Sequence, residues 1–198
     1  LLDSTIHGSD EVERLSNIPI IGLVGKYRYK NNLVVFEKPK SAVAESFRAI
    51  RSSLQFLFKK NNEVGGRTVM VSSSVSGEGK TFCSINIATA YALSGKKTIL
   101  LGLDLRKPKI FKDFGLTNEK GIVNYFIGDH TIAEITNKTH IENLDLITSG
   151  PVPPNPSELL MGSALAKLIA DIRETYDIIV LDTPPVGLVT DALELSQF

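Results

Sequence analysis

The stretch TVMVSSSVSGEGKT, at residues 68–81, decides the fold of this chain. Its β-branched start at residues 68–71 predicts a strand, and the Ala-rich apolar run at residues 82–93 predicts a helix. A glycine-containing turn between a strand and a helix is the context that a phosphate-binding loop needs. Gly77 and Gly79 lack a Cβ atom, so the backbone there can adopt positive φ and turn its N–H groups toward an anion.

The end of this stretch carries the side chains that such a loop uses. Lys80 would place its charge on the β- and γ-phosphates of a nucleotide, and Thr81 would offer a hydroxyl group to Mg²⁺. The strict pattern has glycine at the position of Ser74, so an ordinary strand-to-helix turn is the alternative. We interpret the stretch as a nucleotide-binding loop whose candidate contacts are Ser76, Gly77, Glu78, Gly79, Lys80, Thr81 and Phe82.

The composition limits the class of protein. With 198 residues, 42% of them hydrophobic, the chain can bury the core of one α/β domain with an appendage. The 22 basic and 22 acidic residues balance, which argues against a nucleic-acid partner held by bulk charge. The single cysteine, Cys83, allows no internal disulfide and is expected in the core. No run of 18 apolar residues is present, so we expect no membrane span in this chain.

The first 60 residues divide into a mixed segment and a helix. Residues 26–30 (KYRYK) are basic and aromatic, and they form either a solvated connector or a contact with an anionic surface. Residues 33–36 are expected to form a short strand. Residues 41–60 predict a long helix. The apolar face of this helix is expected to combine Val43, Phe47, Ile50, Leu54, Leu57 and Phe58.

Three charged residues of that helix, Glu45, Arg48 and Arg51, follow one another at a spacing of three along a different face. Spacing alone favours a solvated face with weak pairs inside the helix. The alternative is a contact between subunits, in which arginine pairs bidentately with a carboxylate of a neighbouring copy.

Two apolar strands end in an aspartate. Residues 97–103 (KTILLGL) lead to Asp104, residues 177–181 (DIIVL) lead to Asp182, and residues 144–148 form another expected strand. Strands that alternate with helices indicate a doubly wound, mostly parallel sheet with helices on both faces. Such a sheet would place both acids beside the loop, at the carboxyl ends of the strands. ATPases of this fold usually have more strands, so we expect a truncated carboxyl end.

Capping residues predict where the remaining helices begin and end. A helix over residues 80–93 should end at Ser94 and Gly95. A capping box at residues 131–134 predicts a short helix, Asn155 before a proline predicts the start of another, and residues 164–176 continue it.

The loop and the two acids suggest phosphoryl transfer. Mg²⁺ prefers oxygen ligands, which Thr81 and Asp182 can supply. Asp104 is the candidate for orienting or deprotonating a nucleophile, or for a second metal contact; a structural cap on nearby backbone is the alternative. Arg106 and Lys107 either neutralise charge on the transferred group or lie on the surface.

The candidate catalytic residues are Lys80, Asp104 and Asp182. The candidate metal ligands are Thr81, Asp104 and Asp182, and Arg106 joins the candidate nucleotide contacts.

Taken together, the segments SSSVSGEGKT, LLGLDLRKP, SGPVPPNPSELL and YDIIVLDTPPVGLVTDA resemble the bacterial tyrosine kinases (BY-kinases) that regulate capsule and exopolysaccharide synthesis. The segment SAVAESFRAIRSSL resembles the helix through which those kinases assemble into rings. The segment IPIIGLVGKY is similar to the cytoplasmic link after their second membrane span.

This resemblance implies a P-loop domain of the MinD/ParA kind. Residues 74–81 would be its Walker A motif, Asp104 would belong to Walker A′ and Asp182 to Walker B. Residues 1–40 would be a juxtamembrane-type linker, and residues 41–198 would be the kinase domain, beginning with the oligomerisation helix at residues 41–60. The ring contact would consist of Glu45, Arg48 and Arg51.

The implied activity is phosphorylation of tyrosines with ATP and Mg²⁺, mainly in a Tyr-rich carboxyl tail of the neighbouring subunit. The resemblance implies a ring-like homo-oligomer, a transmembrane activator region in the same or a partner chain, a tyrosine phosphatase and the polysaccharide assembly machinery as partners. It also implies a location at the cytoplasmic face of the bacterial inner membrane. Two features depart from the family pattern: Gly102 replaces the first of two acids in the second motif, and no tyrosine cluster follows Phe198.

Two other functions remain open at this point. A MinD/ParA-type ATPase switch, which dimerises around ATP, shares the sheet and both acids, but it normally has an additional lysine near the start of the loop, where this chain has serines. A non-catalytic module would use nucleotide only to hold a membrane partner.

Overall fold

The structure, a computed structural model, describes residues 8–26, 31–60 and 65–185. Most of the basic segment at residues 26–30 lies outside this part of the chain, as does the end of the last quoted motif, at residues 186–192.

In the described part of the chain, five strands form one sheet in the order β1-β5-β2-β4-β3. The pairs β1 with β5, β5 with β2 and β2 with β4 are parallel, and β3 pairs antiparallel with β4. This arrangement confirms the predicted mostly parallel sheet. The sequence does not predict β3, because its three polar residues carry no strand pattern. The strands are β1 (Arg67–Val71), β2 (Thr98–Gly102), β3 (Thr136–Lys138), β4 (Leu144–Ile147) and β5 (Ile178–Asp182).

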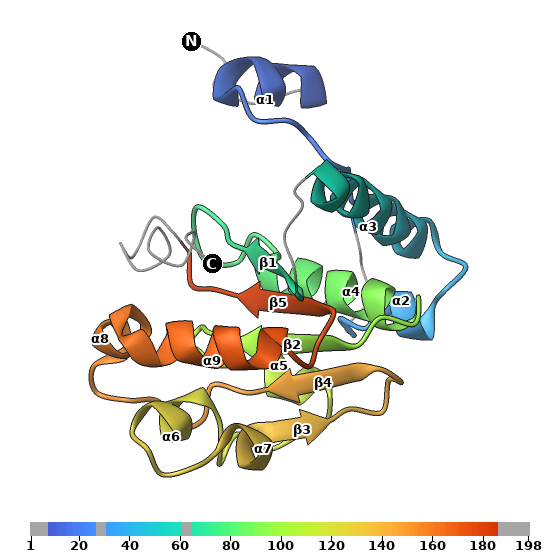
Figure 1. Ribbon diagram of the computed structural model, residues 1–198. Coiled ribbons are helices and arrows are strands. Elements are labelled where there is room, and N and C mark those ends of the chain that lie inside the picture. Colours follow the sequence, from blue (N-terminus) through green and yellow to red (C-terminus); the bar gives the residue numbers. More distant parts are fainter. Residues whose placement is uncertain (1–7, 27–30, 61–64, 186–198) are drawn as a thin grey trace.

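Helices cover both faces of the sheet (Figure 1), as the sequence predicts. Leu100 and Val180 belong to one buried cluster and Leu101 and Leu181 to the other, because successive side chains of a strand point to opposite faces. The first cluster includes residues of α2 (Val34–Glu37), α3 (Ala42–Lys60), α4 (Lys80–Ala92) and α5 (Ile110–Asp113). The second includes residues of α6 (Ile122–Phe126), α7 (Ile132–Ile135), α8 (Pro156–Met161) and α9 (Ser163–Arg173).

The long helix near the amino end is confirmed as α3. Its start is capped by Ser41, whose Oγ accepts a hydrogen bond from the backbone N–H of Ala44 at 3.1 Å. Phe47 and Ile50 are buried, as the expected apolar face requires. Leu57 is 43% exposed and does not belong to that face, whereas Leu54 and Phe58 in the same part of the helix pack against the buried cluster. A shorter helix, α1 (Ser9–Ser16), precedes α3 and has no buried residue.

The strand expected at residues 33–36 is wrong: this segment forms the single helical turn α2. The amide group of Asn86 on α4 explains the difference. It accepts a hydrogen bond from Val35 N at 3.0 Å and donates one to Asn32 O at 2.7 Å. The apolar side chains of Leu33, Val34 and Val35 are buried, so packing overrides the preference of the two β-branched valines for a strand.

The shorter helices follow their cap signals closely. Thr131 and Glu134 form the predicted capping box at the start of α7. Asn155 precedes α8, but its side chain donates to Glu158 Oε2 at 2.7 Å instead of capping the backbone. Gly162 separates α8 from α9, which ends at Arg173, three residues before the predicted end. Across the described ranges, every helix is too short or too polar to cross a lipid bilayer.

Candidate nucleotide-binding site

A cavity of about 250 Å³ opens at the carboxyl ends of β1, β2 and β5, at the start of α4. The structure therefore brings the glycine-containing loop and both strand-end acids together at one edge of the sheet. The candidate site residues that line this cavity are Ser76, Gly77, Gly79, Lys80, Thr81, Phe82, Asp104 and Asp182.

The two loop glycines are needed for their backbone conformation. Gly77 has φ of +95° and Gly79 has φ of +93°. A Cβ atom at either position would meet nothing within 4 Å, so space is not the constraint. Other residues rarely adopt positive φ, and the turn that leads into α4 therefore requires glycine.

The carboxylate of Glu78 accepts hydrogen bonds from the backbone of its own loop and does not line the cavity. Its Oε2 accepts hydrogen bonds from Ser74 N at 2.8 Å and from Val75 N at 3.3 Å. The sequence places Glu78 among the nucleotide contacts, whereas in this structure its carboxylate is turned to the loop's own backbone. Ser74, at the position where the strict pattern has glycine, is thus one of the two residues that this carboxylate holds.

The ammonium group of Lys80 lies between the two acids. Lys80 Nζ is 3.3 Å from Asp182 Oδ1 and 3.5 Å from Asp104 Oδ2. The Lys80 side chain is only 8% exposed, so the ammonium is placed where it can meet an anion with little competition from water.

Asp182 is the most enclosed group of the site, with a side chain that is 4% exposed. Thr81 Oγ1 donates to its Oδ2 at 2.9 Å, and Ser84 Oγ lies 3.1 Å from its Oδ1. Burial raises the pKa of Asp182, and the charge of Lys80 and the two hydroxyl groups oppose that rise. Sequence reasoning misses Ser84, although its position four residues after Lys80, on the same helical face, is a usable signal.

Asp104 forms the backbone cap that the sequence offers as the alternative, and it also faces the cavity. Its Oδ1 accepts a hydrogen bond from Lys107 N at 3.1 Å, which is the structural cap, while its Oδ2 faces Lys80. Lys107 lines the cavity. Arg106 does not: it is exposed and donates to Ser157 Oγ on α8 at 2.7 Å. The structure therefore brings Asp104 into the site and leaves Arg106 outside the cavity.

The oxygen donors of the site suit a hard cation such as Mg²⁺. The hydroxyl group of Thr81 and the carboxylates of Asp182 and Asp104 line one cavity, and Mg²⁺ in nucleotide sites needs only one or two protein ligands besides phosphates and waters. Among the described residues, no three His, Cys, Asp or Glu side chains come together as a metal site. Thr81 and Asp182 would hold the ion, and Asp104 is near enough to add an oxygen.

Gly102, where the family pattern has the first acid of its second motif, lines the same cavity. A Cβ atom there would lie 3.0 Å from Ile110 Cγ2, so even a small side chain would push Ile110 aside by a few tenths of an ångström. Because this position carries no carboxylate, the acidic residues that line the cavity are Asp104 and Asp182.

Cys83 lies on α4 beside the site but belongs to the core side of the helix, where it packs against the first buried cluster. Burial raises the pKa of its thiol, and the charge of Asp182 adds to the rise. The thiol is therefore poorly suited to act as a nucleophile, in agreement with the core position that the sequence predicts.

The three charged residues of α3 lie away from the cavity and divide into two kinds. Arg48 Nη1 pairs with Glu45 Oε2 at 2.6 Å on the exposed surface. Arg51 instead turns inward, where its Nη1 donates to the carbonyl oxygen of Ala90 on α4 at 3.1 Å. Inside one protomer, Arg51 thus ties α3 to α4.

Residues 66–196 match a protein-family model described as an AAA domain. The putative tyrosine-protein kinase CapB of Staphylococcus aureus is 42% identical to this chain over 160 residues, which cover 81% of this chain and 69% of that protein. The tyrosine-protein kinase YwqD of Bacillus subtilis is 34% identical over 86% of this chain and 70% of that protein. The tyrosine-protein kinase Wzc of Salmonella typhi is 37% identical, and the matched part spans 23% of its length.

Solved structures give the same relationship. The chimerical protein CapA2B2 superposes with a TM-score of 0.86 at 38% identity, covering 96% of this chain and 80% of that one. The kinase domain of the Escherichia coli tyrosine kinase ETK superposes with a TM-score of 0.83 at 29% identity, covering 93% and 75%. MinD of Pyrococcus horikoshii, complexed with Mg-ADP, has a TM-score of 0.55 at 22% identity and covers 65% of this chain and 52% of that one, which shows a shared fold alone.

Proposed function

This chain belongs to the bacterial tyrosine-protein kinases, and from that premise we propose that it transfers the γ-phosphoryl group of ATP to tyrosine side chains, with Mg²⁺ at the site. The observation that carries the proposal is the position of the Lys80 ammonium group within 3.5 Å of both Asp104 and Asp182. Phosphoryl transfer is catalysed mainly by positioning and by charge, and this cluster offers a cation, two anions and a hydroxyl group in one cavity.

The loop would bind the phosphates. Gly77 and Gly79 let backbone N–H groups approach an anion, and Lys80 adds a positive charge at the start of α4. Thr81 and Asp182 would hold Mg²⁺, which when bound neutralises charge between the β- and γ-phosphates.

Asp104 is the candidate for accepting the proton of a tyrosine hydroxyl group. Its side chain is 22% exposed, against 4% for Asp182, so an incoming side chain can reach it more easily. The hydrogen bond from Lys107 N fixes its orientation, which a general base requires. Asp182, enclosed by Thr81 and Ser84, suits the metal instead.

We further propose that the main acceptor is a Tyr-rich carboxyl tail of a neighbouring copy, and that cycles of phosphorylation regulate the assembly and export of a capsule or exopolysaccharide. Two of the described tyrosines make poor acceptors: Tyr91 is fully buried, and the hydroxyl group of Tyr176 donates to Asp145 Oδ2 at 2.6 Å. A transmembrane activator region, a tyrosine phosphatase and the polysaccharide assembly machinery are the proposed partners, and the cytoplasmic face of the inner membrane is the proposed location.

The direct test is incubation of the protein with ATP, Mg²⁺ and a peptide that carries several tyrosines, followed by mass spectrometry. We expect phosphotyrosine on the peptide, and none when Mg²⁺ is removed with a chelator. If inorganic phosphate accumulates while the peptide stays unmodified, and the protein dimerises only with ATP, the chain is an ATPase switch and the proposal is wrong.

The charged face of α3 gives a separate prediction about assembly. The Arg48 side chain is 34% exposed and donates to Glu45 and to the carbonyl oxygen of Pro39, so replacing Arg48 with Ala should lower monomer stability by only about 1 kcal/mol. If these residues form the ring contact, Arg48→Ala should nevertheless lower the oligomer mass measured by light scattering in a sample that assembles. Arg51→Ala should also lower Tm, because Arg51 ties α3 to α4.

Ser52→Ala, on an exposed position of the same helix, is the matched control for that experiment and should leave the oligomer mass unchanged. An unchanged mass in Arg48→Ala would mean that this face of α3 is only solvated.

A further inference from the structure

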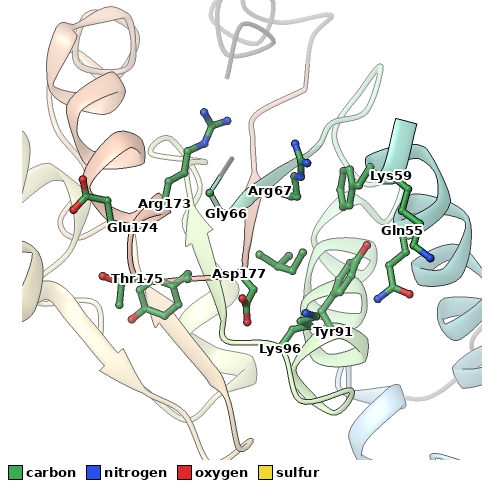
Figure 2. Close-up of a pocket in the computed structure, with 14 residues that line it drawn as sticks. Gln55, Lys59, Gly66, Arg67, Tyr91, Lys96, Arg173, Glu174, Thr175 and Asp177 are labelled. Atoms are coloured by element: carbon green, nitrogen blue, oxygen red, sulfur yellow. The ribbon is translucent and has the colours of Figure 1, made fainter. Parts of the chain in front are cut away.

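A second, larger cavity lies at the opposite end of the strands. It measures about 660 Å³ and opens at the amino ends of β1 and β5, between α9 on one side and α3 and α4 on the other (Figure 2). The cavity at the nucleotide site lies at the carboxyl ends of the same strands, and the two cavities share no lining residue. Five residues of strand separate them, which is about 16 Å, so two ligands can be bound at once.

Among the described residues that line this cavity, basic side chains outnumber acidic ones. Lysine and arginine reach it from α3, from the start of β1, from the turn before β2 and from the end of α9. The acidic side chains at the cavity are Glu174 and Asp177, and the carboxylate of Asp177 already accepts a hydrogen bond from Lys97 N at 2.8 Å. The four basic residues are Lys59, Arg67, Lys96 and Arg173.

The two lysines are available to a ligand. Within the part of the chain that the structure describes, the ammonium groups of Lys59 and Lys96 take part in no hydrogen bond or ion pair. They approach the cavity from the α3 side and from the turn before β2, as Figure 2 shows. Gln55, which like Lys59 belongs to α3, lines the same cavity, and its amide group can donate to the same ligand.

The opposite wall is held in place by internal contacts. Arg173 donates to Thr68 Oγ1 from Nε at 3.2 Å and from Nη2 at 2.9 Å. The guanidinium carbon of Arg67 lies 6.0 Å from the centre of the Phe58 ring. Gly66 closes the base, where a Cβ atom would come within 2.1 Å of the carbonyl oxygen of Tyr176. The cavity is therefore shaped before any ligand arrives, which favours binding.

A buried hydroxyl group helps to hold the wall of the cavity near α4. Tyr91, at the carboxyl end of α4, is fully buried, and its hydroxyl group donates to the carbonyl oxygen of Arg51 on α3 at 3.4 Å. Burial raises the pKa of Tyr91 to about 12, so the hydroxyl group stays protonated at neutral pH and keeps this contact.

We propose that this basic cavity is a second ligand site, which binds a small phosphorylated molecule with at least two negative charges. Its volume lies within the range of small-molecule sites, about 300–1,000 Å³. Its surplus of positive charge selects an anion, and ammonium groups without partners bind phosphate as point charges. The site needs neither ATP turnover nor a protein substrate, so it stands apart from the proposed kinase reaction.

Calorimetry with inorganic pyrophosphate as the probe tests this proposal. Pyrophosphate should bind wild-type protein at two sites, and Lys80→Met, which removes the loop lysine, should retain one of them. Adding Lys59→Gln and Lys96→Gln to that variant should weaken the remaining site by at least about tenfold, because two charge-assisted hydrogen bonds are lost. Lys97→Gln, next to Lys96 but outside this cavity, is the matched control and should leave the affinity unchanged.

A second measurement does not depend on the Lys80 variant. Amide hydrogen exchange of the wild-type protein should slow at residues 65–67 and 174–178 when pyrophosphate is added. The proposal is overturned if pyrophosphate binds only at the loop, if the double lysine variant binds as tightly as its parent, or if Lys97→Gln weakens binding equally.

Discussion

Replacing Lys80 with Met should reduce phosphotyrosine formation by at least about 100-fold, the usual cost of removing one charged group that stabilises a transition state. Lys80 Nζ lies 3.3 Å from Asp182 and 3.5 Å from Asp104, and its side chain is 8% exposed. Methionine fills a similar volume and keeps the helix, but it supplies no charge for the phosphates. The rate is measured as phosphotyrosine formed on a Tyr-rich peptide with ATP and Mg²⁺.

The same substitution should change the pH dependence of stability. The charge of Lys80 opposes the rise that burial causes in the pKa of Asp182, so without it the folded-state pKa of Asp182 rises further. A carboxyl group whose pKa is higher in the folded state than in the unfolded state loses stability as the pH rises from about 4 through the folded-state value. Lys80→Met should therefore be less stable than wild type at pH 7, by up to about 3 kcal/mol, and the difference should shrink on acidification.

Lys97→Met is the control for both measurements, because Lys97 is exposed and does not line the nucleotide cavity. It should leave the kinase rate and the pH dependence unchanged. Phosphotyrosine that persists at the wild-type rate in purified Lys80→Met protein would show that the active site has been assigned wrongly.

Replacing Asp182 with Asn should have a comparable effect on the reaction, about 100-fold or more, and should also raise the Mg²⁺ concentration needed for half-maximal rate. The amide has nearly the shape of the carboxylate but lacks its charge. Its NH₂ group would also face the Thr81 or the Ser84 hydroxyl group, both of which lie within hydrogen-bonding distance of the present carboxylate oxygens. The measurement is the rate as a function of Mg²⁺ concentration.

Asp145→Asn separates this effect from the general cost of losing a buried carboxylate. Asp145 on β4 is also buried, but its carboxylate accepts from Lys138 and Tyr176 and does not line the nucleotide cavity. This variant should lose stability while keeping the Mg²⁺ dependence of wild type. If Asp182→Asn shows the same Mg²⁺ dependence as wild type, Asp182 is not a metal ligand.

Several structural features of the site could be predicted from the sequence. The two glycines before Lys80, Gly77 and Gly79, predict positive φ values at their positions, because few other residues adopt them. The apolar strands before Asp104 and Asp182 predict the meeting of the two acids, because parallel strands end at one edge of the sheet. In both cases the decisive information lies within a few neighbouring residues.

Other features could not be predicted in this way. Glu78 stands inside the motif, yet its carboxylate turns to the amides of Ser74 and Val75, which depends on how the loop closes. Ser84 reaches Asp182 from 98 residues away in the sequence. Arg51 has the same spacing as Arg48 on α3, but it turns inward to donate to the carbonyl oxygen of Ala90 in the last turn of α4.

By itself, the sequence determined the strand, loop and helix at residues 68–93 and the carboxylates that follow two of the other strands. These are local properties, set by residue type, backbone preference and the alternation of side chains along a strand. Only the tertiary structure decided that residues 34–37 form a helical turn, that Arg51 points inward, and that four basic side chains surround a cavity at the amino ends of β1 and β5. Those outcomes depend on which distant segments pack together, because packing decides which polar groups lose water and must find partners within the protein.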